Sequence, residues 1–278
     1  MTRPLPIRLL LFSVKKEQKA FVYEQALDKH QFCSRQVDVA EISNKKIWQL
    51  SLEAQIPWQG IQLKEICHIH VGITTLCDKG YIFSRFKAGK SYFTIKSRLL
   101  NTRVKIERDL LKPVIKGSRI KSGHELVKEY ILFPYRPVNH RYVAIPEEEL
   151  KACFPLAYHY FCKIRPFLDA RDKGKKQYET WYAFGRNQGL NTSFGKKIIF
   201  SPISQQPNFV FSENEEATIY SGYFIKLKEN PSPERYQKLL EQLNSSRMAE
   251  YVAISSRDFR GGWKAYSKNV IEDFVIEL

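Results

Sequence analysis

The segment from Ser255 to Lys268 gathers side chains that are suited to binding another molecule. It holds two arginines, two lysines, two adjacent glycines and three aromatic rings. Arg and Lys neutralise phosphates, Arg can fork onto a guanine edge, and rings can stack. We therefore expect Arg257, Arg260 and Trp263 to read bases and Lys264 to hold a phosphate. The alternative is a tight turn that carries ordinary snorkelling cations.

A second segment, residues 181 to 195, has the same character because rings alternate with glycines. Arg186 suits a guanine edge, and Asn187, Gln188 and Asn191 suit adenine. These four residues are the candidates for base reading in this segment. A glycine-rich hairpin whose polar side chains satisfy its own backbone is the alternative.

A third segment is a basic loop that contains a hydroxyl group. It provides Lys116, Ser118, Arg119 and Lys121 as candidate phosphate contacts. The charge run from Arg171 to Lys176 is expected to be a solvated, flexible stretch. Asp258 lies among arginines and is interpreted as one half of an ion pair that shapes its loop rather than as a catalytic acid.

Composition favours a polyanionic partner. The chain has 278 residues, 43% of them hydrophobic, and a formal charge of +16, so a folded core and a nucleic-acid or acidic membrane surface partner are both compatible with it. No run of about 18 apolar residues is present, which excludes a membrane span on length. The start lacks a signal-peptide cleavage site, and the five cysteines show no paired spacing. We expect a cytoplasmic protein with reduced thiols.

The usual signatures of nucleotide binding, zinc proteolysis and acyl transfer are missing from the sequence. Carboxylates are scattered, and Cys67-His68-Ile69-His70 is more typical of an alternating strand than of a zinc site. No catalytic residue and no metal ligand is therefore predicted. Binding is the simpler function for such a chain.

Periodicity predicts an α+β protein with a β-rich body. A buried strand is expected over residues 7–14, a further strand at 21–23, a helix or connector at 44–52 and a domain boundary near 55. The helical pattern over 147–172 should be kinked or split by Pro155 and Pro166. A brief helix is expected at 107–111, ended by Pro113, and helices at 233–243 and 246–253, the first capped by Ser232. The other strands are expected at 130–135, 197–202, 208–211 and 219–227.

The order of several motifs resembles the C-terminal specificity domain of TaqI-like adenine-specific DNA methyltransferases. The resemblance covers roughly residues 56–278 and is carried by the segments Leu110 to Ser118, Ile131 to Tyr135, Arg171 to Gly174, Trp181 to Leu190, Lys197 to Phe200 and Ser255 to Ser267. Similar domains occur in fused restriction-modification enzymes, and the target recognition domains of type I specificity subunits have a similar role. The resemblance implies an α+β target recognition domain at 56–278, preceded at 1–55 by the tail end of a methyltransferase-type domain and a linker.

The same resemblance implies sequence-specific recognition of duplex DNA for an adenine-N6 DNA methyltransferase or a restriction-modification enzyme. In that family a separate catalytic domain binds S-adenosylmethionine and carries an Asn/Asp-Pro-Pro-Tyr/Phe motif, which this chain lacks. We therefore expect no cofactor in this chain and a methyltransferase or restriction domain or subunit as its partner. An RNA-binding module and a structural docking subunit of a restriction-modification complex remain the alternatives.

Overall fold

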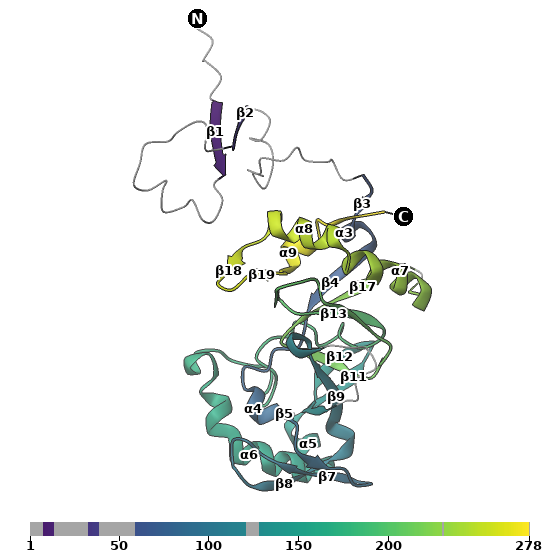
Figure 1. The fold of residues 1–278 in the computed structure, drawn as a ribbon. Coiled ribbons are helices and arrows are strands. Elements are labelled where there is room, and N and C mark those ends of the chain that lie inside the picture. The colour runs from purple at the N-terminus through teal and green to yellow at the C-terminus, as the bar shows by residue number, and fades with distance from the viewer. Residues whose placement is uncertain (1–7, 14–32, 39–58, 121–127, 230, 278) are drawn as a thin grey trace, which may run out of the picture.

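The computed structural model describes residues 8–13, 33–38, 59–120, 128–229 and 231–277 (Figure 1). Strands β1 (Arg8–Ser13) and β2 (Cys33–Asp38) pair antiparallel, and β1 matches the strand predicted over 7–14. The predicted strand at 21–23, the helix or connector at 44–52, the boundary near 55 and Lys121 lie outside the described residues. The rest of the described chain forms two lobes, which we call the terminal lobe (residues 61–71 and 197–276) and the central lobe (residues 73–194).

The terminal lobe is built on an antiparallel sheet of four strands. Their order is β15 (Phe209–Ser212), β13 (Lys197–Phe200), β17 (Tyr223–Leu227) and β4 (Cys67–Val71). The predicted alternating strand at Cys67 to His70 is confirmed by β4. Helices α7 (Pro233–Leu243) and α8 (Ser246–Ser255) pack on the sheet, with α3 (Leu63–Ile66) and α9 (Lys268–Ile271) beside them. Strands β3 (Ile61–Gln62) and β20 (Val275–Ile276) pair antiparallel, so the two ends of this lobe are joined.

Helix α7 follows the sequence closely. Ser232 caps it by accepting a hydrogen bond from the Arg235 amide, and Pro233 occupies its first turn, where a missing N–H costs nothing. Tyr236, Leu239 and Leu243 are buried against the sheet. The cap and the apolar spacing therefore predicted this helix correctly.

The central lobe contains a second sheet of four strands, in the order β16 (Thr218–Tyr220), β9 (Leu111–Lys116), β10 (Glu129–Leu132) and β5 (Ile82–Phe83). Strand β16 belongs in sequence to the terminal lobe but pairs parallel with β9, so it ties the lobes together. The lobe is completed by the hairpin β11 (Tyr135–Val138) and β12 (Arg141–Ala144), by the sheet of β6 (Phe86–Lys87), β7 (Tyr92–Lys96) and β8 (Arg103–Glu107), and by helix α4 (Asp78–Tyr81).

The helical pattern over 147–172 is split at Phe154, as predicted, into α5 (Glu147–Cys153) and α6 (Pro155–Asp169). Pro155 begins α6 and Pro166 lies inside it. Both carboxylate oxygens of Glu107, at the end of β8, accept hydrogen bonds from the first amides of α6, those of Leu156 (2.7 Å) and Ala157 (2.8 Å). A carboxylate in this place satisfies two N–H groups that have no partner within the helix.

Two predicted boundaries differ from the structure. The brief helix at 107–111 is a single 3-10 turn, η3 (Arg108–Leu110), and Pro113 lies within β9 instead of ending a helix. The strand predicted over 219–227 is broken into β16 and β17 by a turn at Ser221 and Gly222. Ser221 has a φ of 52°, a left-handed conformation that a continuous strand cannot contain.

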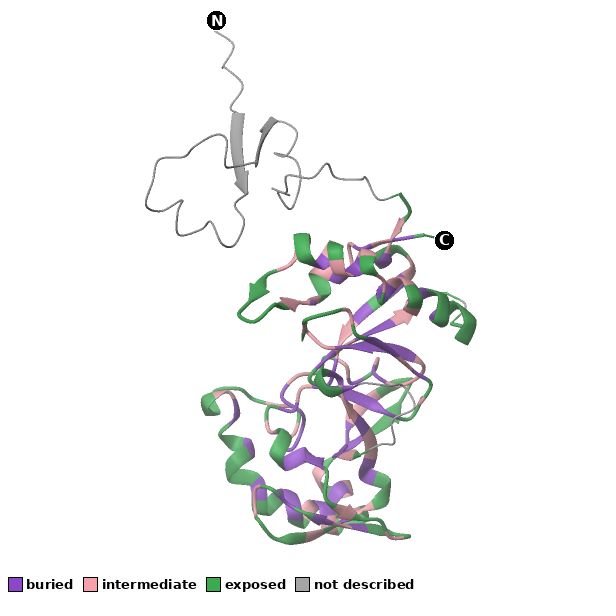
Figure 2. Ribbon diagram, viewed as in Figure 1, coloured by how far each residue is buried: buried purple, intermediate pink, exposed green. Residues whose placement is uncertain are grey.

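The lobes meet where backbone segments approach unusually closely. A Cβ added to Gly117 would lie 2.8 Å from the Cα of Gly222, and one added to Gly72 would lie 2.7 Å from the Ile219 carbonyl oxygen. A Cβ on Gly189 would lie 2.6 Å from the Val71 oxygen. We call the four positions Gly72, Gly117, Gly189 and Gly222 the glycine junction. Buried residues line the strands in this middle region, whereas exposed residues cover the outer sides of the helices (Figure 2).

The fold is mixed α+β, as predicted, with several small sheets and seven α-helices among the described residues. None of the helices within these residues has the length and apolar character needed to cross a membrane.

Candidate nucleic-acid interface

The polar and aromatic segment from Ser255 to Lys268 forms a β-hairpin on the terminal lobe. Strands β18 (Asp258–Phe259) and β19 (Trp263–Ala265) pair antiparallel, and β14 (Ile203–Ser204) pairs with the other side of β19. Gly261 and Gly262 turn the chain with φ values of 79° and 78°, which glycine adopts without steric cost. The glycine pair therefore makes the hairpin turn.

The hairpin presents two aromatic rings to solvent. Phe259 and Trp263 face each other in register and are 40% and 44% exposed. Tyr266, three residues further on, is buried and packs edge-on against Phe209 at 6.1 Å. Trp263 is thus free to meet a ligand, whereas Tyr266 belongs to the core.

The charged residues of the hairpin also differ in whether they are free to meet a ligand. Arg257 and Arg260 are exposed and form no ion pair with any described residue. Lys264, predicted to hold a phosphate, is ion-paired with Asp258 across the hairpin. The prediction that Asp258 shapes its loop through an ion pair is confirmed, and its partner is a lysine.

Residues 181–195 form a series of turns on the central lobe rather than the hairpin considered as an alternative. One antiparallel bridge joins Arg186 to Thr74, and the Gly185 amide donates to the Thr75 oxygen at 3.1 Å. The loop that follows β4, residues 72–77, therefore supports the segment predicted to read bases. Sequence reasoning did not assign this supporting loop to the site.

Arg186 is held by a carboxylate. Its guanidinium forks onto Asp172, with nitrogen–oxygen distances of 2.7 and 3.1 Å, and the Tyr178 hydroxyl donates to the same carboxylate at 3.0 Å. The hydrogen bond from Arg186 lowers the pKa of Asp172 to about 2. Asp172 and Lys173 both have left-handed backbones, with φ of 49° and 59°, so the pair also fixes a strained turn.

The charge run at 171–176 was predicted to be solvated, and this is wrong for Arg171. Its side chain is buried and donates to the carbonyl oxygens of Leu168 (2.8 Å), Ala183 (2.6 Å) and Trp181 (2.8 Å). Its guanidinium also lies 4.3 Å from the centre of the Tyr178 ring. Carbonyl groups, two of them from the segment 181–183, replace the water that a charge run normally binds. The composition of the run itself does not reveal these partners.

The amide side chains of this segment differ in whether they already form a hydrogen bond within the protein. Asn187 and Gln188 are exposed. Asn191 is also exposed, but its Oδ1 accepts a hydrogen bond from the Tyr142 amide at 2.6 Å. Two-point recognition of adenine uses both the oxygen and the nitrogen of an amide, and only Asn187 and Gln188 present both here.

The predicted phosphate loop lies at the glycine junction. Lys116 ends β9, with its ammonium 5.7 Å from the centre of the Tyr220 ring, and Ser118 and Arg119 are exposed in the 3-10 turn η4 (Gly117–Arg119). The Ser118 hydroxyl lies 3.3 Å from that of Ser221. Gly189, in the predicted base-reading segment, packs against Val71 and Gly72 of the same junction. The fold therefore gathers two of the three predicted segments around one point.

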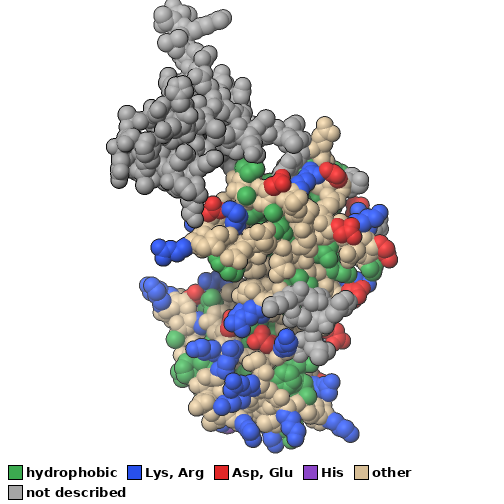
Figure 3. All heavy atoms as spheres, in the orientation of Figure 1, with side chains coloured by type: hydrophobic (Ala, Val, Ile, Leu, Met, Phe, Trp, Pro, Cys, Tyr) green, Lys and Arg blue, Asp and Glu red, His purple; other side chains and the backbone are tan. Residues whose placement is uncertain are grey.

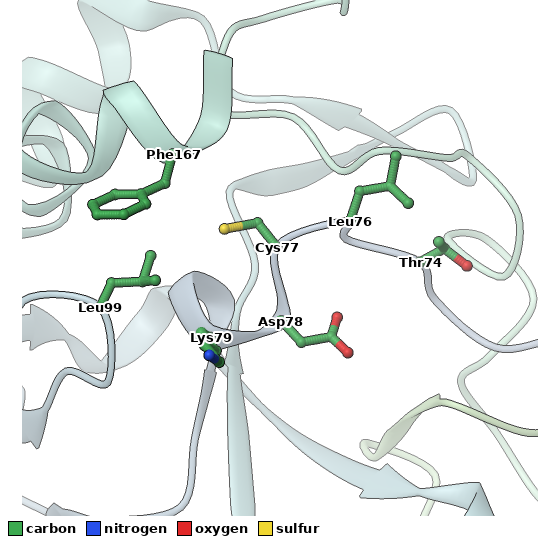
Figure 4. A pocket seen from close by; sticks show the side chains of 7 residues that line it. All are labelled: Thr74, Leu76, Cys77, Asp78, Lys79, Leu99 and Phe167. Carbon is green, nitrogen blue, oxygen red and sulfur yellow. The ribbon is translucent and has the colours of Figure 1, made fainter. Parts of the chain in front are cut away.

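An open, mainly apolar cavity of about 450 Å³ lies beside the supporting loop (Figure 4). The side chains of Phe167 and Leu99 and the sulfur of Cys77 approach one another on one side of the view, and Leu76 stands on the other. Leu76 is 40% exposed and has a φ of 58°, a rare conformation for a bulky residue. Burial raises the pKa of the Cys77 thiol, which favours its protonated form over the nucleophilic thiolate.

The hairpin and the turn after α6 project to the same side of the molecule, from different lobes (Figure 1). The surface between them is hollowed, and Lys and Arg side chains stand on both sides of the hollow (Figure 3). Exposed cations of the hairpin are Arg257 and Arg260, and those of the turn include Lys173 and Lys175. We call this surface the basic hollow. Within the described residues no group of three or more His, Cys, Asp or Glu could hold a metal ion.

Two curated proteins are distantly similar to this chain. The type II restriction enzyme and methyltransferase RM.Eco57I of Escherichia coli is 26% identical over 219 residues, which are 72% of this chain and 21% of that protein. The type II methyltransferase M.BanIII of Aneurinibacillus aneurinilyticus is 24% identical over 232 residues, 79% of this chain and 37% of that protein. No protein-family model matches the chain. The chain is thus related to type II restriction-modification methyltransferases and spans well under half the length of either relative.

Proposed function

We propose that residues 56–278 are a target recognition domain that reads a short duplex DNA sequence for an adenine-N6 DNA methyltransferase or a fused restriction-modification enzyme. The relationship to type II restriction-modification methyltransferases supports the class of protein. The net charge of +16 supports a polyanionic ligand.

The observation that carries the proposal is the β18–β19 hairpin. It holds the exposed rings of Phe259 and Trp263 between two exposed arginines, Arg257 and Arg260. Exposed rings of this size are unfavourable in water, and arginines beside them provide both phosphate contact and a fork for guanine. This combination fits a groove of duplex DNA, where charged backbone and apolar base edges lie side by side.

We assign base reading first to Gln188 and Asn187, whose amides are exposed, and to Arg257, Arg260 and Trp263 of the hairpin. Arg186 would have to exchange the Asp172 carboxylate for a guanine edge. Asn191 would keep its bond to the Tyr142 amide and offer only its NH₂ group. These two residues fit better as supports that become base contacts only if DNA displaces their present partners.

We assign phosphate contact to Lys116, Ser118 and Arg119 at the glycine junction. Lys264 would exchange Asp258 for a phosphate, and Lys121 retains the same role as a sequence prediction. These contacts carry no sequence information, because every nucleotide offers the same phosphate. They would orient the domain so that its amides and arginines reach base edges.

Methyl transfer in this proposal is performed by a catalytic domain or partner subunit that binds S-adenosylmethionine. These 278 residues contain no Asn/Asp-Pro-Pro-Tyr/Phe motif, which would hold an adenine flipped out of the duplex. The chain's own contribution is to select the sequence at which that partner acts.

Selection of bound duplexes from a random-sequence pool by the full chain tests the proposal. We expect an enriched sequence whose binding weakens with salt, with a log–log slope of about −0.9 for each phosphate neutralised. Gln188→Ala should relax the preference at one base pair by roughly 5- to 150-fold, the equivalent of about 1–3 kcal/mol. Lys116→Ala should weaken binding to all sequences alike.

Gln237→Ala is the matched control, since Gln237 is an exposed amide on α7 in the other lobe. It should leave both the enriched sequence and the affinity unchanged. Recovery of no preferred sequence by the wild-type chain would overturn the proposal. Preferential binding of single-stranded RNA in competition would overturn it in favour of an RNA-binding module.

A further inference from the structure

The sheet of β6, β7 and β8 has one apolar and one strongly basic face. Phe86, Phe93, Ile95 and Ile106 point to the core, where Phe86 stacks on Phe93 with a centroid distance of 5.4 Å. Alternation along the strands points the side chains at every second position to the opposite face. This outer face includes Lys87, Thr94, Lys96, Arg103 and Lys105, and all four of its cations are exposed.

The cations of this face lie next to one another. Lys96 is directly opposite Arg103 in the antiparallel register, and Thr94 separates Lys87 from Lys105 across the three strands. Like charges in directly opposed positions destabilise a sheet. None of these four cations forms an ion pair with a described residue. The fold therefore retains a repulsion between Lys96 and Arg103. A carboxylate in place of either residue would relieve it.

The surrounding segment reinforces this charge. Residues 84–108 contain eight Lys and Arg and one acidic residue, Glu107, a net charge of +7 within a chain of +16. Both oxygens of Glu107 are occupied by the first amides of α6. In Figure 3, Lys and Arg side chains gather at the end of the molecule where Figure 1 places β7 and β8. We call the outer face of this sheet the distal basic face.

The chemistry of this face suits phosphate rather than bases. Its cations are accompanied by Thr94 and by Tyr92, which is 38% exposed and lies 4.5 Å beneath the Lys105 ammonium. No Asn or Gln lies on these three strands to read a base edge. Hydroxyl groups and cations bind phosphate oxygens without regard to sequence.

We infer that the distal basic face binds the sugar-phosphate backbone of duplex DNA that flanks the recognised sequence. This inference rests on the proposed function and adds a second contact surface to it. Figure 1 shows the β7–β8 end of the central lobe far from the β18–β19 hairpin, so one duplex would have to extend beyond the recognised sequence to touch both.

The test is the variant Lys87→Glu with Lys96→Glu, measured in the full chain against duplexes of about 40 and about 12 base pairs that carry the enriched sequence. Loss of two phosphate contacts should reduce the salt slope by about 1.8 on the long duplex, which is on the order of 50-fold in affinity at about 0.1 M salt. The preferred sequence should stay the same. On the short duplex, affinity should equal that of the wild type.

The matched control is Lys228→Glu with Lys238→Glu, which changes the net charge equally at two exposed positions of the terminal lobe. The ratio of its affinities for the long and the short duplex should equal that of the wild type. The Lys87→Glu, Lys96→Glu variant should unfold at the same or a higher temperature, because the carboxylate introduced on β7 would face Arg103. A loss of binding by this variant therefore cannot be attributed to misfolding.

Four results separate the possible failures. Equal losses for the two double variants, or equal losses on long and short duplexes, would overturn the inference and leave sequence recognition in place. Unchanged DNA affinity after charge reversal would also overturn it and favour an acidic protein as the partner of this face. Absence of any duplex binding by the wild-type chain would instead overturn the proposed function.

Discussion

At the scale of single residues, burial decides what each candidate side chain is able to do. Trp263 and Tyr266 come from the same segment, but one is exposed and the other belongs to the core. Arg186 and Arg171 come from neighbouring polar stretches, and the structure provides a carboxylate for Arg186 but carbonyl oxygens and the Tyr178 ring for Arg171. The type of residue indicates which ligand groups its side chain could bind. Its surroundings determine whether the side chain is exposed and without another partner.

Lys197 is a buried cation that is held by carbonyl groups. Its ammonium donates to the carbonyl oxygens of Ser193 and Ala217, and burial lowers its pKa to about 7. The hydroxyls of Ser193, Ser212 and Thr218 are buried and have no hydrogen-bond partner among the described residues. The unfolded chain keeps an ordinary lysine pKa near 10.5, so unfolding takes up a proton at any pH between about 7 and 10.5.

Because the folded pKa of Lys197 is the lower one, we expect this residue to make the free energy of unfolding rise with pH above about 7. The slope should approach about 1.4 kcal/mol per pH unit. Urea unfolding between about pH 7 and 8.5 measures this slope. At higher pH the raised pKa of the Cys67 thiol makes the free energy of unfolding fall with pH, so the range stops below it. Lys197→Met should abolish the rise, whereas Lys238→Met, at an exposed site, should retain it. An unchanged slope in Lys197→Met would contradict the assignment.

At the scale of elements, local signals predicted helices better than loops. The Ser232 cap and apolar spacing of α7, and the break before Pro155, were read correctly because they depend on neighbouring residues. The turns of the glycine-rich block at 181–195 could not be predicted from neighbouring residues, because they are held by the loop after β4 and by Asp172. Partners distant in sequence leave no periodic pattern.

Helix α6 is expected to depend on a residue of another element, Glu107 at the end of β8. Glu107→Gln leaves one amide oxygen in place of two carboxylate oxygens at the first turn, so the protein should lose about 1–2 kcal/mol of stability. Chemical denaturation measures this loss. Glu250→Gln is the control because Glu250 is exposed on α8, and it should change stability by less than about 0.5 kcal/mol. Similar values for both variants would show that α6 does not need this cap.

At the scale of the whole molecule, the glycine junction holds the two lobes and two of the predicted contact segments in one arrangement. Gly72 directly follows β4, Gly117 begins η4, Gly189 lies in the segment 181–195 and Gly222 lies in the turn between β16 and β17. Their backbones approach too closely for any side chain. The relative placement of the two predicted segments therefore depends on the junction.

Gly189 and Gly262 provide a matched comparison, because both have left-handed backbones, with φ of 74° and 78°. A Cβ at Gly262 meets nothing within 4 Å, so Gly262→Ala should cost only about 1–2 kcal/mol of backbone strain. Gly189→Ala adds a clash with the Val71 carbonyl and should cost about 1–3 kcal/mol more. Thermal unfolding compares the two. Equal costs in stability for the two variants would mean that the backbone at the junction moves to accommodate the added methyl group without a further penalty.

The sequence by itself determined the α+β class, the strongly basic net charge, the split helical pattern over 147–172, the helix capped by Ser232, and the three segments that hold the candidate contact residues. These properties follow from charge, periodicity and capping, which act over a few neighbouring residues. Only the tertiary structure decided which of those residues are free: it occupies Arg186, Asn191 and Lys264 and leaves Gln188, Arg257, Arg260 and Trp263 exposed. It also revealed the distal basic face, because strand register, which depends on pairing between separate segments, determines which cations lie together.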